Sequence, residues 1–254
     1  MTIFFDIETG PLPVEELQAK FESQWEAPPH PGEFDPASVK YGNTKDKDKR
    51  AEKLAECQQA HAAAVAKYAE TAEQAKQEDW TKYLEGAALS PITGRVLAIG
   101  MLDCPSNRKM LGSVHTLPED ELLGKWWEKA VSQIKAGRLL VGHSIFFFDL
   151  PFLIQRSWIL GVEVPTVIRK SSRYWADQFV DTRELWQCGD RQCKSSLDHI
   201  AQALKVGGKP EDVTGADFAR LFWSTDEADR RKAFDYLAND LDMTRAIANR
   251  MGII

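Results

Sequence analysis

The sequence lacks an excess of basic residues, and this absence narrows the classes of protein to which the chain can belong. Its 254 residues include 32 Lys and Arg against 38 Asp and Glu, which gives a formal net charge of -6. A protein that coats nucleic acid depends on Lys and Arg to neutralise phosphates, so we do not expect that role. An enzyme whose site is built from carboxylates is compatible with the charge, because such a site is acidic until its cations bind.

The chain is also poor in cysteine and has no long apolar run. Cys57, Cys104, Cys188 and Cys193 form no Cys-x-x-Cys pair, so we expect reduced thiols rather than a disulfide framework. The last two, taken with His199, lack the spacing and the fourth ligand of a usual zinc site. No apolar run reaches the length of a membrane span, and the first residues lack the features of a signal peptide. We therefore expect a cytoplasmic protein that does not interact with membranes.

What the sequence does contain is an α/β pattern that is interrupted near its start. Thr2 to Glu8 is a run of mostly apolar residues ended by turn residues, which is typical of a buried strand. From there to residue 88 the chain is rich in Ala, Glu, Lys and Gln, and Lys45 to Leu84 contains neither Pro nor Gly. Strong helix formers without breakers favour a long helix. The sequence therefore predicts a helical hairpin inserted after the first strand.

The spacing of apolar residues predicts the elements that follow the insertion. Strands come first and helices increasingly follow, which is typical of a mixed sheet covered by helices. We expect residues 1–11 and 89–254 to form one α/β domain and residues 12–88 to form an α-helical insertion. The predicted strands cover residues 94–102, 113–117 and 138–143, and the predicted helices cover residues 118–137, 150–161 and 225–247.

Two acidic residues stand out in the first predicted strand. Asp6 and Glu8 are two positions apart, so their side chains leave the strand on the same face. They also lie at its carboxyl end, where open α/β sheets place their ligand sites. Burying an unpaired carboxylate is costly, and a hard cation is a common partner for such a group. The alternative is that Ile7 faces the core while both acids face solvent.

Later acidic residues favour a shared site. Asp149 follows the predicted strand 138–143 and is flanked by Phe and Leu residues. A helix N-cap would explain this residue by itself, but not its occurrence together with the acidic pair of the first strand. Tyr236 and Asp240 are four positions apart and therefore share one face of a helix.

In chain order, these residues form three motifs: FDIET at residues 5–9, GHSxxxFD at 142–149 and YxxxD at 236–240. The ordered set resembles the exonuclease motifs of the DEDD superfamily, in its tyrosine-containing (DEDDy) branch. It is most similar to stand-alone proteins related to the proofreading exonuclease domain of family B DNA polymerases. The resemblance covers residues 1–10 and roughly 89–254, and it implies a ribonuclease-H-like fold with the helical insertion after the first strand.

The resemblance implies a 3′→5′ exonuclease that hydrolyses phosphodiester bonds. In such an enzyme Asp6, Glu8, Asp149 and Asp240 would bind two divalent cations, Mg²⁺ or Mn²⁺, and Tyr236 would orient the attacking water. Carboxylates suit these hard cations. The expected substrate is nucleic acid, with single-stranded 3′ ends of DNA favoured over RNA. Trimming of RNA 3′ ends, as by ribonuclease D, and a nucleic-acid-binding adaptor with little catalysis remain open alternatives.

The same resemblance suggests which residues contact substrate. The loop after Glu8 would approach the terminal nucleotide, and a Phe of the second motif would stack on a base. Ser144 stands where the family commonly has Asn. The expected substrate contacts are Thr9, Gly10, Ser144, Phe148 and Arg173.

The insertion itself carries a cluster of basic residues near the start of the predicted long helix. Lysines and one arginine alternate there with acidic residues, which favours a solvated helix face over a nucleic-acid contact. We also regard the insertion as a candidate surface for a protein partner. The basic residues are Lys45, Lys47, Lys49, Arg50 and Lys53.

Overall fold

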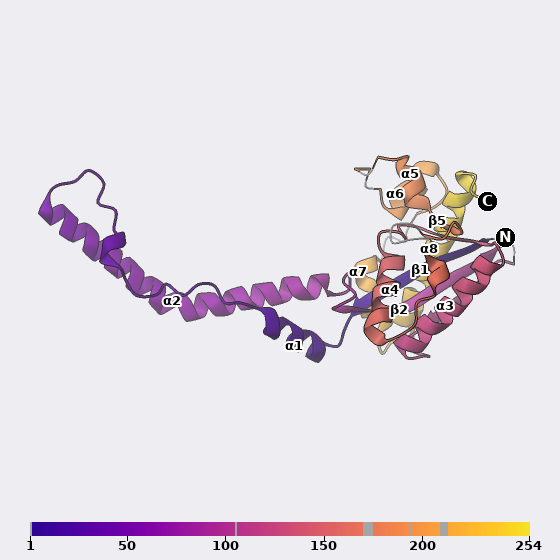
Figure 1. The fold of residues 1–254 in the computed structure, drawn as a ribbon, viewed down its shortest axis with the longest axis horizontal. Helices are drawn as coiled ribbons and strands as arrows, with labels where there is room; N and C mark the ends of the chain where they lie inside the picture. The colour runs from indigo at the N-terminus through magenta and orange to yellow at the C-terminus, as the bar shows by residue number, and fades with distance from the viewer. Residues whose placement is uncertain (1, 105, 170–174, 191, 194, 209–212) are drawn as a thin grey trace. The chain divides into compact units, whose positions relative to one another are not determined.

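The computed structural model of the protein divides the chain into two compact units (Figure 1). One unit comprises Met1–Leu12 and Ala87–Ile254 and is called here the sheet domain. The other comprises Pro13–Gly86 and is called the insertion. The structure describes residues 2–104, 106–169, 175–190, 192–193, 195–208 and 213–254.

The sheet domain is built on one mixed sheet of five strands in the order β3-β2-β1-β4-β5. The central strand β1 is antiparallel to β2 and parallel to β4. This order, with helices packed on the sheet, is a ribonuclease-H-like fold and confirms the fold class predicted from the sequence. The strands are β1 (Thr2–Pro11), β2 (Gly94–Cys104), β3 (Arg108–Ser113), β4 (Leu139–Gly142) and β5 (Phe179–Asp181).

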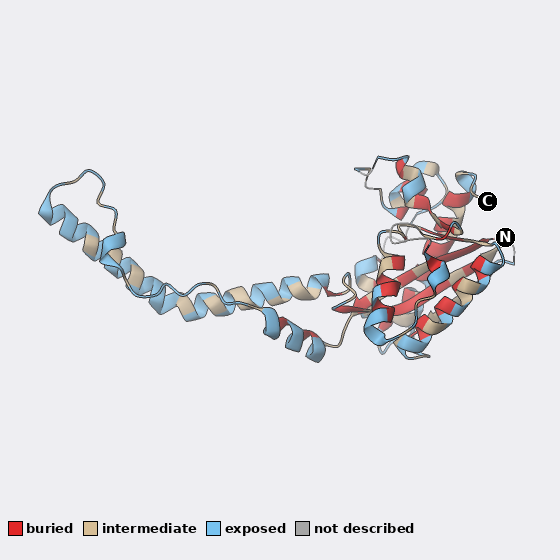
Figure 2. Ribbon diagram, viewed as in Figure 1, coloured by how far each residue is buried: buried red, intermediate tan, exposed pale blue. Residues whose placement is uncertain are grey.

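Helices cover both faces of the sheet, because β1 is apolar on both. Phe5 and its neighbours two positions away on either side pack into the largest core cluster, with side chains of α3 and α4. Phe4 points to the other face and packs against Leu241 and Ala248 of α8. Figure 2 shows this buried central strand in red. The helices are α3 (Glu119–Lys135), α4 (Asp149–Leu160), α5 (Thr182–Gln187), α6 (Leu197–Leu204), α7 (Gly215–Phe222) and α8 (Glu227–Arg250), with a 3₁₀ turn η2 (Thr166–Ile168).

Helix α8 packs unusually close to the sheet at Gly100 of β2. A Cβ atom added at this glycine would lie 3.0 Å from side-chain atoms of both Leu237 and Leu241, which is tighter than an ordinary van der Waals contact. Gly100 is the cross-strand partner of Asp6. The missing side chain therefore lets α8 approach the sheet at the position of the first acidic residue.

Three details of the sheet differ from the prediction. Strand β1 runs on to Pro11, so Asp6 and Glu8 lie within it rather than at its carboxyl end, and the residues after Glu8 belong to the strand rather than to a loop. The predicted strand 113–117 is wrong, because β3 ends at Ser113. The carbonyl of Ser113 accepts hydrogen bonds from the amides of Thr116 and Leu117, so the following residues form a turn that leads into α3. The short strand β5 was not predicted, since three residues are too few to show a periodic pattern.

The insertion contains α1 (Val14–Gln24), the 3₁₀ turn η1 (Pro36–Ser38) and the 41-residue helix α2 (Lys47–Ala87). The long helix agrees with the prediction. The helical hairpin is formed only in part. In the arm that precedes α2, α1 is the only α-helix among the described residues, and most of the chain between α1 and α2 has no regular secondary structure. Pro28, Pro29, Pro31 and Pro36 account for this, since proline disfavours a helical conformation in the residue before it.

This irregular segment runs along α2 in the opposite direction, held by contacts with successive turns of the helix. The Trp25 indole donates to Asp79 over 3.2 Å, and the Tyr68 hydroxyl donates to the carbonyl of Pro28 over 2.8 Å. Further along, the His61 ring stacks edge-on against Phe34, with ring centroids 5.5 Å apart. His61 and Tyr68 of α2 are thus half-buried against the segment that precedes the helix.

Candidate metal centre

Three acidic side chains meet where the middle of β1 lies beside α8. Asp6, Glu8 and Asp240 each offer a carboxylate oxygen, and these oxygens lie within 4.8 Å of one another. Asp6 and Glu8 leave β1 on the face that packs against α8. Asp240 is buried and stands next to Leu241, which packs close to Gly100. Residues separated by more than 230 positions in the sequence therefore form one cluster of hard oxygen ligands.

The fourth acid, Asp149, contacts β1 at the edge of the strand that pairs with β4. Strand β4 pairs with β1 only from Thr2 to Phe4, so the following residues of β1 extend beyond their parallel neighbour. The Ile7 amide donates to Oδ1 of Asp149 over 3.2 Å, and this carboxylate supplies an acceptor where β4 has ended. Asp149 thus lies against the backbone of the residue between Asp6 and Glu8.

Asp149 is one of the most buried acids of the described chain, with 3% of its surface exposed. Burial raises the pKa of its carboxyl to about 7; the hydrogen bond from the Ile7 amide lowers the pKa and the nearby Asp181 raises it. A carboxylate in this position is costly without a compensating charge. A bound cation would supply such a charge, but Asp149 is not among the three acids whose ligand oxygens lie within 4.8 Å of one another.

The loop between β4 and α4 is shaped by Asp181, whose role the motifs alone do not reveal. One carboxylate oxygen accepts from the amide of Ser144 over 2.8 Å and the other from the amide of Phe146 over 3.0 Å. The first oxygen also accepts from the amide of Arg183 and so caps α5. Asp181 is buried and positions the loop that leads into Asp149. The Asp-Thr pair at 181–182 was its only signal in the sequence.

A glycine allows β4 and this loop to approach β1 closely. A Cβ atom added at Gly142 would lie 2.8 Å from the carbonyl oxygen of Phe5 and would also collide with the Ile145 side chain. Two residues later, Ser144 adopts a φ of 64°. This left-handed conformation is unfavourable for most residues and is tolerated better by Asn. Asn would thus suit the backbone at this position better than Ser does.

Tyr236 lies one helical turn before Asp240 on the same face of α8. The ring is buried, with 4% exposed, and it packs beside Phe218 of α7 with ring centroids 6.4 Å apart. Its hydroxyl is near the start of α7, where a Cβ atom added at Gly215 would lie 3.4 Å away. Helix α7 thereby fixes the tilt of the phenol.

The two phenylalanines before Asp149 differ in their surroundings. Phe148 is half-buried and packs against the core cluster, with its ring centroid 5.4 Å from that of Phe152. Phe147 is 57% exposed, and the Arg183 guanidinium lies 5.7 Å from its ring centroid. Arg183 also donates to the Ser144 hydroxyl over 2.9 Å. Phe147 is therefore the ring that is open to a ligand, and the motif pattern had pointed to Phe148.

The remaining predicted substrate contacts lie at the end of β1 or outside the described residues. The Thr9 hydroxyl donates to the carbonyl of Ala88 over 2.8 Å, so its side chain is engaged within the sheet domain. Gly10 is buried, and an added Cβ atom would lie 3.2 Å from Ala219 of α7. Arg173 is outside the part of the chain that the structure describes. These three assignments stay predictions.

The donor set and its geometry fit divalent cations. Every candidate ligand atom is a carboxylate oxygen, the type that Mg²⁺ and Mn²⁺ prefer. The cluster of Asp6, Glu8 and Asp240 joins a strand to a helix, and Asp149 lies on the backbone of the same strand. Among the described residues, no helix is both long and apolar enough to cross a membrane.

Comparisons with known proteins bear on the fold alone. No protein-family model matches the chain, and no curated protein matches its sequence. Among solved structures, the chain is similar to the family B DNA polymerase from the hyperthermophilic archaeon Pyrobaculum calidifontis, with a TM-score of 0.53 and 18% sequence identity. The match covers 66% of this chain and 23% of the polymerase chain. The chain thus shares the fold of a part of that much longer protein.

Proposed function

We propose that the protein is a metal-dependent 3′→5′ exonuclease of the DEDDy type, acting on DNA with single-stranded 3′ ends. The observation that carries the proposal is the cluster of Asp6, Glu8 and Asp240, whose ligand oxygens lie within 4.8 Å of one another. Two further features support it: Asp149 lies buried against the same strand, and Tyr236 precedes Asp240 by one turn. The fold is shared with a part of a family B DNA polymerase, and the three sequence motifs resemble the proofreading domain of that polymerase family.

The reaction is hydrolysis of the last phosphodiester bond. Water attacks the phosphorus, the bond to the 3′ oxygen of the preceding nucleotide breaks, and a nucleoside monophosphate leaves. Cations held by Asp6, Glu8, Asp149 and Asp240 would neutralise the phosphate oxygens and stabilise the leaving oxygen.

Side chains of the protein would position the attacking water and the substrate. Tyr236 would hold the attacking water by a hydrogen bond from or to its hydroxyl, and helix α7 keeps that hydroxyl in place. The exposed ring of Phe147 would stack on a base near the 3′ end, because aromatic faces bind single strands without reading their sequence. Asp181 would act through the β4–α4 loop as a positioning residue that touches no substrate.

The test is a nuclease assay on single- and double-stranded DNA and RNA of one sequence, labelled at the 5′ end or at the 3′ end. With Mg²⁺ or Mn²⁺ the 5′-labelled strand should shorten stepwise, the 3′-labelled strand should release labelled mononucleotide at once, and chelator should stop both. Asp6→Asn removes one charge at almost constant volume and should abolish hydrolysis. Tyr236→Phe should slow turnover while leaving cation binding intact, as measured by calorimetry.

Different results would direct the assignment elsewhere. Faster shortening of RNA than of DNA would favour RNA trimming. Binding of nucleic acid without cation-stimulated release of mononucleotides would favour an adaptor. Full activity of Asp6→Asn would refute the proposed metal centre.

A further inference from the structure

The insertion concentrates its positive charge at one end. Residues 13–86 contain ten basic and fifteen acidic residues, yet six of the basic and only three of the acidic residues fall within residues 40–53. We call this stretch the basic turn, because it joins the irregular segment to the start of α2. The remainder of the insertion holds four basic and twelve acidic residues. The basic turn is therefore a positive end on an otherwise acidic unit.

Three of these lysines line one hollow. Lys40 comes from the irregular segment, while Lys49 and Lys53 are four positions apart on α2 and share a helix face. The hollow has a volume of about 390 Å³, and Tyr41, Gly42 and Thr44 complete its lining. No acidic residue contributes to this lining.

Neighbouring charged groups are held by other contacts of the basic turn. The Asp46 carboxylate accepts from the backbone amides of Asp48 and Lys49 at the start of α2. Arg50 donates from Nε to the carbonyl of Thr44 over 2.8 Å, and its guanidinium lies 5.2 Å from the centroid of the Tyr41 ring. These contacts order the turn. Every charged group that lines the hollow is a lysine ammonium group.

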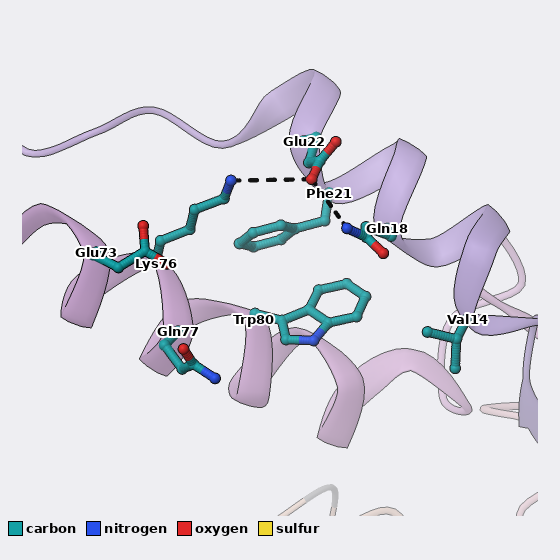
Figure 3. A pocket seen from close by; sticks show the side chains of 8 residues that line it. All are labelled: Val14, Gln18, Phe21, Glu22, Glu73, Lys76, Gln77 and Trp80. Atoms are coloured by element: carbon teal, nitrogen blue, oxygen red, sulfur yellow. Dashed lines mark hydrogen bonds and ion pairs between the residues drawn. The ribbon is translucent and has the colours of Figure 1, made fainter.

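Two other hollows in the insertion have a different character. One lies between α1 and α2, where Phe21 faces Trp80 and Lys76 pairs with Glu22 at 4.0 Å (Figure 3). The other is lined only by Glu and Gln residues of α2. Neither presents the net positive charge that an anion requires, so the lysine hollow is a distinct feature of the basic turn.

We propose that the lysine hollow of the basic turn binds backbone phosphates of the nucleic acid on which the sheet domain acts. This proposal rests on the proposed function and extends it with a second binding site. Lysine is a point charge that attracts phosphate without the fixed two-pronged geometry of arginine. Lys40, Lys49 and Lys53 therefore suit a repeating polyanion that is held without sequence preference. The sheet domain as a whole has 22 basic against 23 acidic residues, which is a net charge close to zero.

The experiment compares two double variants of the full chain that remove the same charge from the same end of the insertion. The first variant, Lys49→Gln with Lys53→Gln, removes two of the three lysine charges that line the hollow. Lys45→Gln with Lys47→Gln removes two exposed lysines outside it. Binding of a fluorescent single-stranded DNA is followed by anisotropy in chelator, over a series of salt concentrations, so that hydrolysis does not intervene.

Loss of two phosphate contacts lowers the slope of log K against log salt by about 1.4, because each contact to a single strand contributes about 0.7. At about 0.1 M salt this slope corresponds to roughly 25-fold weaker binding. We expect this loss of affinity in the Lys49/Lys53 variant. The affinity of the Lys45/Lys47 variant should fall by no more than about threefold, since salt screens the attraction between DNA and charges that lie outside the hollow. Circular dichroism checks that α2 stays folded in both.

The outcomes separate this proposal from the proposed function. Equal weakening in both variants, or no weakening in either, would overturn the lysine hollow while leaving nuclease activity intact. Selective weakening in a protein that cannot hydrolyse DNA would support the hollow and refute the exonuclease. Competition by inorganic phosphate at concentrations equal to those of DNA phosphate would show a site for free phosphate and would overturn the polyanion assignment.

Discussion

The buried carboxyl of Asp149 makes the stability of the metal-free protein depend on pH. Its pKa rises from an ordinary 3.8 to about 7 in the folded chain, chiefly because it is buried. Between these two values the unfolded chain has lost the proton and the folded chain keeps it. Stability is therefore greatest below about pH 4 as far as this group is concerned, and falls as pH rises to about 7.

The size of the effect follows from the shift. One pKa unit corresponds to about 1.4 kcal/mol, so the full penalty of ionised Asp149 is about 4 kcal/mol, of which about 3 kcal/mol appears between pH 5 and pH 8. Asp149→Asn keeps an oxygen that accepts from the Ile7 amide and removes the ionisation. Between pH 5 and pH 8 the free energy of unfolding of the variant should therefore fall by about 3 kcal/mol less than that of the unchanged protein.

The assay is urea denaturation of both proteins in chelator at pH 5, 6, 7 and 8. Taking the difference between the two proteins removes the contribution of titrating groups that do not interact with Asp149. At pH 8, added Mg²⁺ should restore stability to the unchanged protein and do so less in Asp149→Asn. Parallel pH profiles for the two proteins in chelator would refute the argument that burial of this carboxyl is uncompensated.

Two further predictions concern the loop before Asp149. Phe147→Ala should raise the KM for single-stranded DNA about tenfold, because one base stack is lost. It should change the free energy of unfolding by less than about 0.5 kcal/mol. Phe148→Ala is the matched control and should lower the free energy of unfolding by about 2 kcal/mol, because the Phe148 ring packs on the core. The reverse pattern would show that the two rings have been assigned wrongly. Ser144→Asn should raise the free energy of unfolding by about 0.5 kcal/mol, since Asn tolerates the left-handed backbone better than Ser, and easier unfolding in urea would contradict this reading.

The sequence predicts the fold class because its strongest signals are local. The apolar strand around Asp6 and the uninterrupted helix formers of α2 predict single elements from contiguous residues, and the resemblance carried by the three motifs implies a ribonuclease-H-like fold. The strand predicted at 113–117 was wrong because alternation also occurs in a turn that leads into a helix. The three residues of β5 carry too little pattern to be recognised without a neighbouring strand.

The site illustrates the same limit. Spacing alone placed Asp6 with Glu8 and Tyr236 with Asp240, but it could not show that the two pairs meet. That meeting depends on the close approach of α8 at Gly100, a contact between distant parts of the chain. The roles of Asp181 and Phe147 depend on loop geometry, which the spacing of residues in the sequence does not show.

The place where the insertion joins the sheet has an evolutionary consequence. Pro11 and Gly94 are cross-strand partners, and the Leu12 amide donates to the carbonyl of Thr93 over 2.9 Å, so the chain leaves β1 and returns to β2 through adjacent points. The entropic cost of closing such a loop grows only slowly with its length. The insertion can therefore become longer, become shorter or be replaced in the course of evolution while the pairing of Asp6 with Gly100 stays in register.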